Sequence, residues 1–285
     1  MPAHASAVYR GRFAPTPSGP LHLGSLTTAV ASWLDARQHG GHWLLRIDDL
    51  DPPREVPGAA DTIRQQLEQC GLHWDGPVIY QSQRQMHYTD AVEQLLRQGD
   101  AFRCALSRKD LAAYPGGHPG PSVAVTDNED TAVRLAVPDE ERQLVDACAG
   151  AWPYNLQRLG GAFVIRRRDG LFAYQLACAV DDAAFAITHV LRGDDLLPST
   201  PQQCYVLERL GLQQPRYAHI PVIRDAAGEK LSKSAGSARI DASDPAREMA
   251  RALAGLALPH DPQAPAEEQL ARALSAWQSP FGPAA

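Results

Sequence analysis

Two polar segments, far apart in the chain, carry residue types that handle phosphate groups. The first, PTPSGPLHLGS at residues 15–25, is a stiff proline turn that leads into a helical pattern. A helix N-terminus presents unpaired backbone N–H groups and a partial positive charge, which suit an anion. His22 would add a donor there, Ser25 a hydroxyl group, and Gly24 room for a base or a phosphate. A prolyl turn before a capped helix, with His22 simply exposed, explains the same residues equally well.

The second segment is KLSKS at residues 230–234, flanked by Gly228 and Gly236. Two lysines and two hydroxyl groups in a flexible loop can follow the charge that develops on a polyphosphate. Taken alone, such a run is more often a solvated surface turn. The chain has no GxxxxGK[ST], GxGxxG, HExxH or GxSxG motif, so the familiar phosphate loop, dinucleotide fingerprint, zinc pair and nucleophile elbow are excluded.

The elements that position these segments alternate between strand and helix. Apolar periodicity predicts strands at residues 8–13, 43–47 and 78–80, with helices around residues 23–34 and 63–70 between them and a further helix at residues 86–96. This alternation predicts an α/β fold in which helices cover both faces of a parallel sheet. Ligands of such folds bind beyond the carboxyl ends of the strands. Asp48, at the end of the second strand, would lie at that edge.

The remaining chain divides by composition into four stretches. Residues 1–102 are expected to form the first half of the main α/β domain, and the Pro/Gly-rich start of residues 103–170 indicates an inserted subdomain. Residues 171–236 form the second half, where the sheet pattern resumes at Ala173. Residues 237–285 are rich in Ala, Leu and Arg and predict a helical segment. Further elements are expected as strands at residues 132–137, 163–168, 187–191 and 217–223 and as a helix at residues 201–210.

Net charge, apolar segments and cysteine content indicate the cellular compartment. The 285 residues carry a net charge of -6, so a uniformly basic nucleic-acid coat is excluded while a local basic groove is not. No secretory signal core and no span of about 20 apolar residues is present. Five dispersed cysteines fit reduced thiols better than a disulfide framework. The sequence therefore predicts a cytoplasmic protein without a membrane anchor.

The paired segments resemble the two signatures of class I aminoacyl-tRNA synthetases. Four further runs, RFAP at 12–15, LRIDDLD at 45–51, LRGDDL at 191–196 and YAHIP at 217–221, resemble the glutamyl branch and occur in the expected order. Only 51 residues follow Ser234, too few for the anticodon-binding domains of a full-length member. The resemblance is therefore to the short members of this branch, with a Rossmann-like catalytic domain and no anticodon-binding domain.

The resemblance implies a set of site residues. ATP would be bound by His22, Gly24, Ser25, Lys230 and Lys233, with His22 and Lys233 holding the phosphates and Mg²⁺ on the polyphosphate. L-glutamate would be held by Arg12, Phe13, Ala14, Pro15, Thr16, Asp48, Tyr174 and Arg192. Arginine binds carboxylates bidentately, which suits Arg12 and Arg192. An ion pair at the surface for these arginines, and a core position for Tyr174, are the alternative interpretations.

Two departures from the family pattern matter. The family places Glu where this chain has Asp48, which is one methylene shorter; alternatively Asp48 is a surface carboxylate in an acidic turn. The family often binds zinc with three cysteines and a tyrosine, and here Cys104 and Tyr114 match while Leu106 and His118 take the other positions. Because leucine cannot ligate zinc and structural zinc needs four ligands, no bound zinc is expected.

The acceptor is implied by the resemblance alone. Glutamate, activated without tRNA, would pass to the queuosine base in the anticodon of tRNA(Asp), and no obligatory protein partner is evident. Arg166, Arg167 and Arg168 could contact tRNA phosphates or form a solvated strand edge. Two other classes stay open: a synthetase-like module that binds tRNA or a partner without catalysis, and a small-molecule adenylyltransferase.

Overall fold

The computed structural model describes residues 8–114, 117–121, 131–222 and 239–283. Two compact units make up the chain. The first comprises Met1–Tyr80, Ile187–Leu196 and Pro215–Ala285, and the second comprises Gln81–Ala186 and Leu197–Gln214. Each unit is therefore assembled from separate segments of the chain, and those of the first unit are far apart in the sequence.

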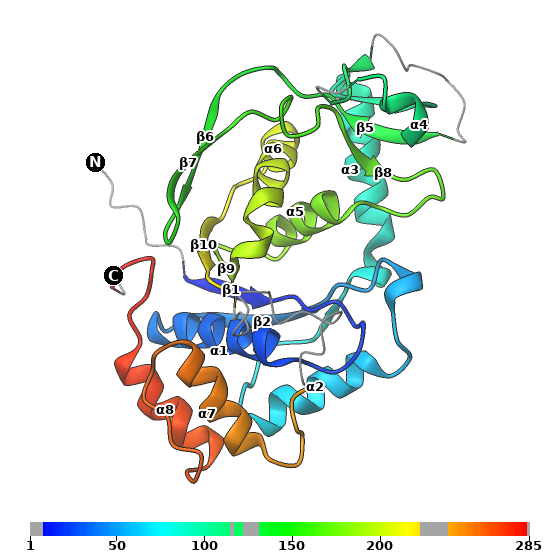
Figure 1. Cartoon of the computed structure of the whole chain (residues 1–285). Coiled ribbons are helices and arrows are strands. Elements are labelled where there is room, and N and C mark those ends of the chain that lie inside the picture. Colours follow the sequence, from blue (N-terminus) through cyan, green and yellow to red (C-terminus); the bar gives the residue numbers. More distant parts are fainter. Residues whose placement is uncertain (1–7, 115–116, 122–130, 223–238, 284–285) are drawn as a thin grey trace. The chain divides into compact units, whose positions relative to one another are not determined.

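Parallel strands form the centre of the first unit (Figure 1). The strands β1 (Arg10–Phe13), β2 (His42–Ile47) and β3 (Ile79–Tyr80) form a sheet in that order, with every pairing parallel. The strands β9 (His189–Gly193) and β10 (Arg216–Ile220) also pair in parallel. Thr188, directly before β9, donates its backbone N–H to the carbonyl of Arg10 at 3.0 Å, so β9 starts beside β1. The predicted α/β fold with a parallel sheet is confirmed.

Helix α1 (Leu23–Gln38) carries the core of the first unit. Its apolar side chains Leu26, Val30 and Leu34 are fully buried against the strands. The remaining helical elements of this unit are η1 (Pro52–Arg54), α2 (Ala59–Gln69), α7 (Pro245–Gly255) and α8 (Ala266–Ala276). Helices α7 and α8 both pack on α1, which confirms the expected helical segment after residue 237.

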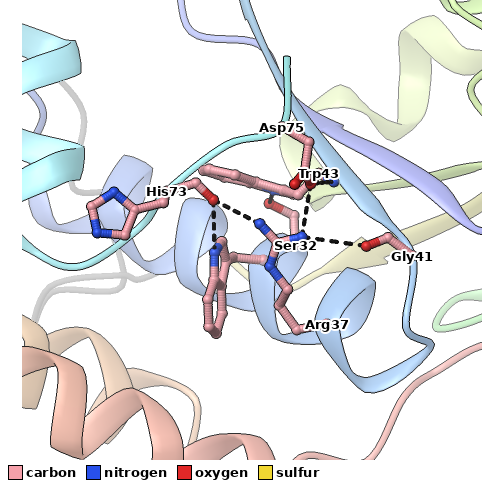
Figure 2. A network of polar contacts seen from close by, with 7 residues as sticks. Ser32, Arg37, Gly41, Trp43, His73 and Asp75 are labelled. Carbon is pink, nitrogen blue, oxygen red and sulfur yellow. Dashed lines mark hydrogen bonds and ion pairs between the residues drawn. The ribbon is translucent and has the colours of Figure 1, made fainter.

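A polar clamp ties the end of α1 to the start of β2, as Figure 2 shows. Arg37 donates from Nη1 to Asp75 Oδ2 at 2.7 Å and from Nη2 to the His73 carbonyl at 2.8 Å. The same Asp75 oxygen accepts the backbone N–H of Trp43 at 2.7 Å. Although burial opposes ionisation, the hydrogen bonds from Arg37 and Trp43 leave the pKa of Asp75 below its usual range. The clamp fixes where β2 begins.

The second unit combines a small antiparallel sheet and an antiparallel hairpin with helices. Strands β4, β5 and β8 form one sheet, and β6 and β7 form a hairpin. Asp181 is buried in α5 and accepts hydrogen bonds from Gln81 Nε2, Arg84 Nε and Tyr88 Oη, which joins α5 to the chain around α3. The elements are η2 (Gln81–Arg84), α3 (Gln85–Gln98), β4 (Ala101–Cys104), α4 (Arg108–Leu111), β5 (Ala132–Leu135), β6 (Arg142–Asp146), β7 (Gly150–Tyr154), β8 (Phe163–Arg166), α5 (Tyr174–Ala184) and α6 (Thr200–Leu210), with η4 (Asp194–Ser199) crossing the boundary between the units.

Several sequence expectations match these elements with shifted ends. The expected strands at 132–137 and 163–168 end earlier, at Leu135 and Arg166, and the strand expected at 217–223 is β10. The first element after Ala173 is the helix α5. The β6–β7 hairpin has no counterpart in the sequence analysis, because apolar and polar residues do not alternate regularly along either strand, RQLVD or GAWPY.

Candidate active site

His22 is the N-cap of α1 and is fixed by Ser25. The backbone N–H of Ser25 donates to His22 Nδ1 at 3.1 Å, while Ser25 Oγ accepts the His22 N–H at 2.9 Å and donates to the His22 carbonyl at 2.8 Å. An Nδ1 that accepts a hydrogen bond carries no proton, so the ring N–H is on Nε2. His22 therefore caps the helix, as one interpretation expected, although it is half-buried rather than exposed, and its contact with a phosphate stays a prediction.

The other members of the predicted ATP site divide into two groups. Gly24 and Ser25 lie in the first turn of α1, where no carbonyl group of the helix itself accepts the backbone N–H groups. Lys230 and Lys233 lie outside the described residues. Arg239, the first residue described after them, forms a β-bridge with His22, and Ile240 N–H donates to the Leu21 carbonyl at 3.1 Å. Residues 239 and 240 thus lie beside the start of α1.

Three charged side chains are buried near the carboxyl ends of neighbouring parallel strands. Arg12 lies on β1, Asp48 follows β2, and Arg192 lies on β9, with exposed fractions of 5%, 7% and 4%. The backbone N–H of Asp48 donates to the Pro15 carbonyl at 3.0 Å, which joins the loops after β1 and β2. These residues are therefore neither surface ion-pair partners nor, for Asp48, part of an exposed acidic turn. Buried charges of this kind require partners or ligands.

Asp48 has a guanidinium partner that the sequence analysis did not assign. Arg46 Nε lies 2.7 Å from Asp48 Oδ1, and Arg46 Nη2 lies 3.4 Å from Oδ2. Arg46 is only 1% exposed. One signal was available in the sequence: an arginine inside the otherwise apolar strand pattern of residues 43–47, two positions before Asp48.

Arg192 is oriented by the neighbouring strand β10. Its Nε donates to His219 Nε2 at 3.0 Å, and the two residues are register partners across the parallel pair. Its guanidinium carbon also lies 5.5 Å from the centre of the Tyr217 ring. Because His219 Nε2 accepts, its ring proton is on Nδ1. A Cβ at the next residue, Gly193, would lie 2.5 Å from Asp195 Oδ1 and 2.8 Å from Val222 Cγ1, so a larger residue there would require these two side chains to move.

The segment from Phe13 to Thr16 divides into a core residue and a loop. The Phe13 ring is buried and stacks on Trp43 with centroids 6.2 Å apart, so only its backbone is available to a ligand. Ala14, Pro15 and Thr16 are half-buried in the loop after β1. Contact of this backbone with glutamate stays a prediction.

The remaining predicted residues lie in the second unit. Tyr174 is half-buried at the first position of α5, and its role in binding glutamate stays a prediction. Arg167 pairs with Asp169 at 2.6 Å and Arg168 donates to the Ala105 carbonyl at 2.9 Å, both at exposed positions. Both arginines therefore have local partners, as a solvated strand edge would.

The region of the family's zinc site contains a hydrogen-bonded pair instead of a ligand shell. Gly120 N–H donates to His118 Nδ1 at 3.0 Å, so Nε2 carries the ring proton and faces Cys104 Sγ at 3.3 Å. Leu106 packs on the small cluster of Phe102, Cys104 and Ala162. Across the described ranges, no group of three or more His, Cys, Asp or Glu residues could hold a metal ion. These residues do not fit a four-ligand zinc site.

Comparison with known proteins defines the class of this protein. Residues 9–117 and 122–251 match the family described as tRNA synthetases class I (E and Q), catalytic domain. The chain therefore belongs to the class I tRNA synthetases of the glutamate and glutamine type, as the parallel sheet and the two signature segments predict.

Relatives of known name make the assignment narrower. A protein from Pseudomonas putida (strain W619), named glutamyl-Q tRNA(Asp) synthetase, is 50% identical over 95% of this chain and 93% of its own length. A protein of the same name from Pseudomonas aeruginosa is 51% identical over 95% of this chain and 94% of its own. This chain is thus similar along nearly its whole length to proteins of that name.

Solved structures agree with the family assignment. A glutamate-tRNA synthetase from Elizabethkingia anophelis has a TM-score of 0.79 and 26% identity, and the match covers 93% of this chain. A glutamate tRNA ligase from Elizabethkingia meningosepticum, solved in complex with its amino acid, has a TM-score of 0.78 and 25% identity, with 97% of this chain covered. This chain spans 65% and 66% of the lengths of those two chains.

Within the described ranges, no helix has the length and apolar character needed to cross a bilayer.

Proposed function

We propose that this protein activates L-glutamate with ATP in the absence of tRNA and transfers the glutamyl group to the queuosine base in the anticodon of tRNA(Asp). One observation of the site carries the proposal. Two arginines and one carboxylate, Arg12, Arg192 and Asp48, are buried near the carboxyl ends of adjoining parallel strands. Glutamate carries two carboxylates and one ammonium group, so this set of charges complements it. The names of the relatives supply the acceptor.

In the first step an oxygen of the glutamate α-carboxylate attacks the α-phosphorus of ATP. A C–O–P bond forms, and the bond to the β-phosphate breaks with its electron pair leaving on pyrophosphate. The protein's contribution is position and charge stabilisation. His22 would donate from Nε2 to the phosphates, Lys230 and Lys233 would follow their charge, and Gly24 would lie beside the adenosine. Mg²⁺ would arrive on the polyphosphate of ATP as part of that substrate.

In the second step the glutamyl group passes from AMP to the modified base, and AMP leaves. Arg166, Arg167 and Arg168 are candidates for contact with phosphates of the anticodon stem-loop. The cytoplasm, where tRNA is modified and the cysteines stay reduced, is the proposed compartment. The reaction as written needs no obligatory protein partner.

ATP–pyrophosphate exchange, measured without tRNA across all amino acids, tests the first step. The expected result is exchange that depends on glutamate and is much weaker with aspartate, glutamine or any other amino acid. Exchange supported best by another amino acid would overturn the assignment of the substrate. Absence of exchange with every amino acid would favour a synthetase-like module without catalysis.

A further inference from the structure

The buried guanidinium of Arg46 has no part in the functions described so far. It lies in β2 between Leu45 and Ile47, which are both fully buried. Side chains two positions apart in a strand point to the same side, and this places Arg46 beside Asp48. Its Nε contacts Asp48 Oδ1 at 2.7 Å and its Nη2 contacts Oδ2 at 3.4 Å, so each carboxylate oxygen faces one guanidinium nitrogen.

Two contacts of this kind fix a carboxylate in space. An aspartate side chain turns about two torsion angles, and a planar guanidinium that meets both oxygens sets both of them. The backbone N–H of Asp48 is held as well, by the Pro15 carbonyl at 3.0 Å. A carboxylate offers about four acceptor positions, so a guanidinium and an ammonium group can share one carboxylate. The short Asp48 side chain is thus held in one orientation.

We propose that Arg46 is a positioning residue that holds the Asp48 carboxylate in the orientation that receives the substrate ammonium group. The inference rests on the proposed function and deepens it, because it names a residue that acts on substrate binding through Asp48. The proposal also explains how Asp48 can replace the glutamate that the family has at this position. An aspartate reaches less far than the family's glutamate, and a fixed carboxylate loses less conformational entropy on binding than a mobile one.

The alternative is that the pair is structural only. A buried arginine that loses its carboxylate leaves an uncompensated charge, so removal of either partner destabilises the fold. Loss of stability alone therefore does not identify a positioning role. The measurement that separates the two is the KM for glutamate set against the KM for ATP and against kcat.

The experiment uses ATP–pyrophosphate exchange of the full chain with three variants: Arg46→Met, Asp48→Asn and the double variant. We expect Arg46→Met to raise the KM for glutamate about tenfold or more, the size of one lost charge-assisted hydrogen bond, and to leave the KM for ATP within about twofold. If Arg46 acts through Asp48, the KM of the double variant lies within about twofold of that of Asp48→Asn. Full multiplication of the two single effects would overturn the proposal.

Arg37→Met is the matched control. Arg37 also pairs with an aspartate, Asp75 at 2.7 Å, in the same unit but in the clamp at the start of β2. This variant should lower the melting temperature and leave the KM for glutamate unchanged. A folded Arg46→Met enzyme with a wild-type KM for glutamate would overturn the positioning role. Should Arg46→Met fail to fold, Arg46→Lys keeps the positive charge but cannot contact both carboxylate oxygens as a planar guanidinium does. A raised KM for glutamate in this variant supports the positioning role, and an unchanged KM overturns it.

Measurements on the wild-type protein separate an error in the role of Arg46 from an error in the proposed function. If the wild-type protein neither exchanges nor binds glutamate in calorimetry, both are wrong. If the wild-type protein exchanges with glutamate and the Arg46 variants keep its KM, only the inference is wrong.

Discussion

His22 combines a structural and a chemical task in one side chain. Its Nδ1 caps α1 through the Ser25 N–H, and this contact leaves the ring proton on Nε2. Asparagine is an equally good N-cap, but it places no imidazole N–H toward a phosphate. We therefore expect His22→Asn to keep the melting temperature and to lower the kcat of ATP–pyrophosphate exchange by about 10²–10³-fold.

His22→Ala provides the comparison, because alanine neither caps nor donates. It should lose about 1 kcal/mol of stability in addition to the loss of kcat. If His22→Asn exchanges at the wild-type rate, the ring has a capping role only.

His189 makes folding depend on pH. Its ring stacks on Tyr9 at 4.2 Å and meets Phe281 edge-on at 4.7 Å. Burial, and then the nearby Arg216, lower its pKa from 6.5 to about 4, against a smaller opposing effect of Asp35. Between these two pH values His189 binds a proton in the unfolded chain but not in the folded one. The free energy of unfolding therefore falls as the pH drops from about 7 toward 4.

His189→Phe keeps an aromatic ring at this position and removes the titration. We expect the free energy of unfolding of the variant to fall less than that of the wild type between pH 7 and pH 5, measured by urea unfolding at both pH values. His73→Gln, at an exposed position, is the control and should follow the wild type. An equal fall in His189→Phe and the wild type would show that another group causes the pH dependence.

At the scale of elements, sequence periodicity predicts the strands and helices that bury apolar side chains. It misses features that depend on polar contacts. The strands around residues 43–47 and 187–191 and the helix from residue 23 stand out because their apolar residues recur at strand or helix spacing. The β6–β7 hairpin lacks that signal. The start of β2 depends on the clamp of Arg37, Asp75 and Trp43, whose contacts join residues 38 and 32 positions apart and leave no local pattern.

The candidate site shows the same division. Motif resemblance predicts His22, Arg12, Asp48 and Arg192, and the structure places them at a helix cap or in buried positions near strand ends. The partners Arg46 and His219 were missed, because their role depends on geometry across or along strands rather than on residue type. Lys230 and Lys233 lie outside the described residues and stay predictions.

The Cys104–His118 pair gives a prediction for the element that replaces the family's zinc site. Burial and Arg134 lower the pKa of His118, which favours the neutral ring that donates to Cys104. We expect purified protein to contain no stoichiometric zinc by metal analysis, and excess chelator to leave the melting temperature unchanged. His118→Ala should lower it, since Cys104 loses a buried partner. One zinc per chain would contradict this account.

At the scale of the whole molecule, chain segments distant in sequence build the first unit. Trp277 donates from Nε1 to the buried Asp35 at 3.0 Å, and Arg216 donates to the Phe281 carbonyl at 3.3 Å, so the C-terminal segment completes the core around α1. The Ala-, Leu- and Arg-rich composition of residues 237–285 predicts a helical segment but not where it packs. The same assembly of distant segments brings β1, β2 and β9 together and with them the three buried charges of the site.

The central claim is the transfer of glutamate to a modified anticodon base, and one measurement tests it most directly. Radiolabelled glutamate, ATP and the full chain are incubated with tRNA(Asp) that contains queuosine, with tRNA(Asp) that lacks it, and with tRNA(Glu) as a control. The account predicts label on the queuosine-containing tRNA(Asp) and background levels on the other two. Label on unmodified tRNA(Asp) or on tRNA(Glu), or no label on any of the three, would contradict it.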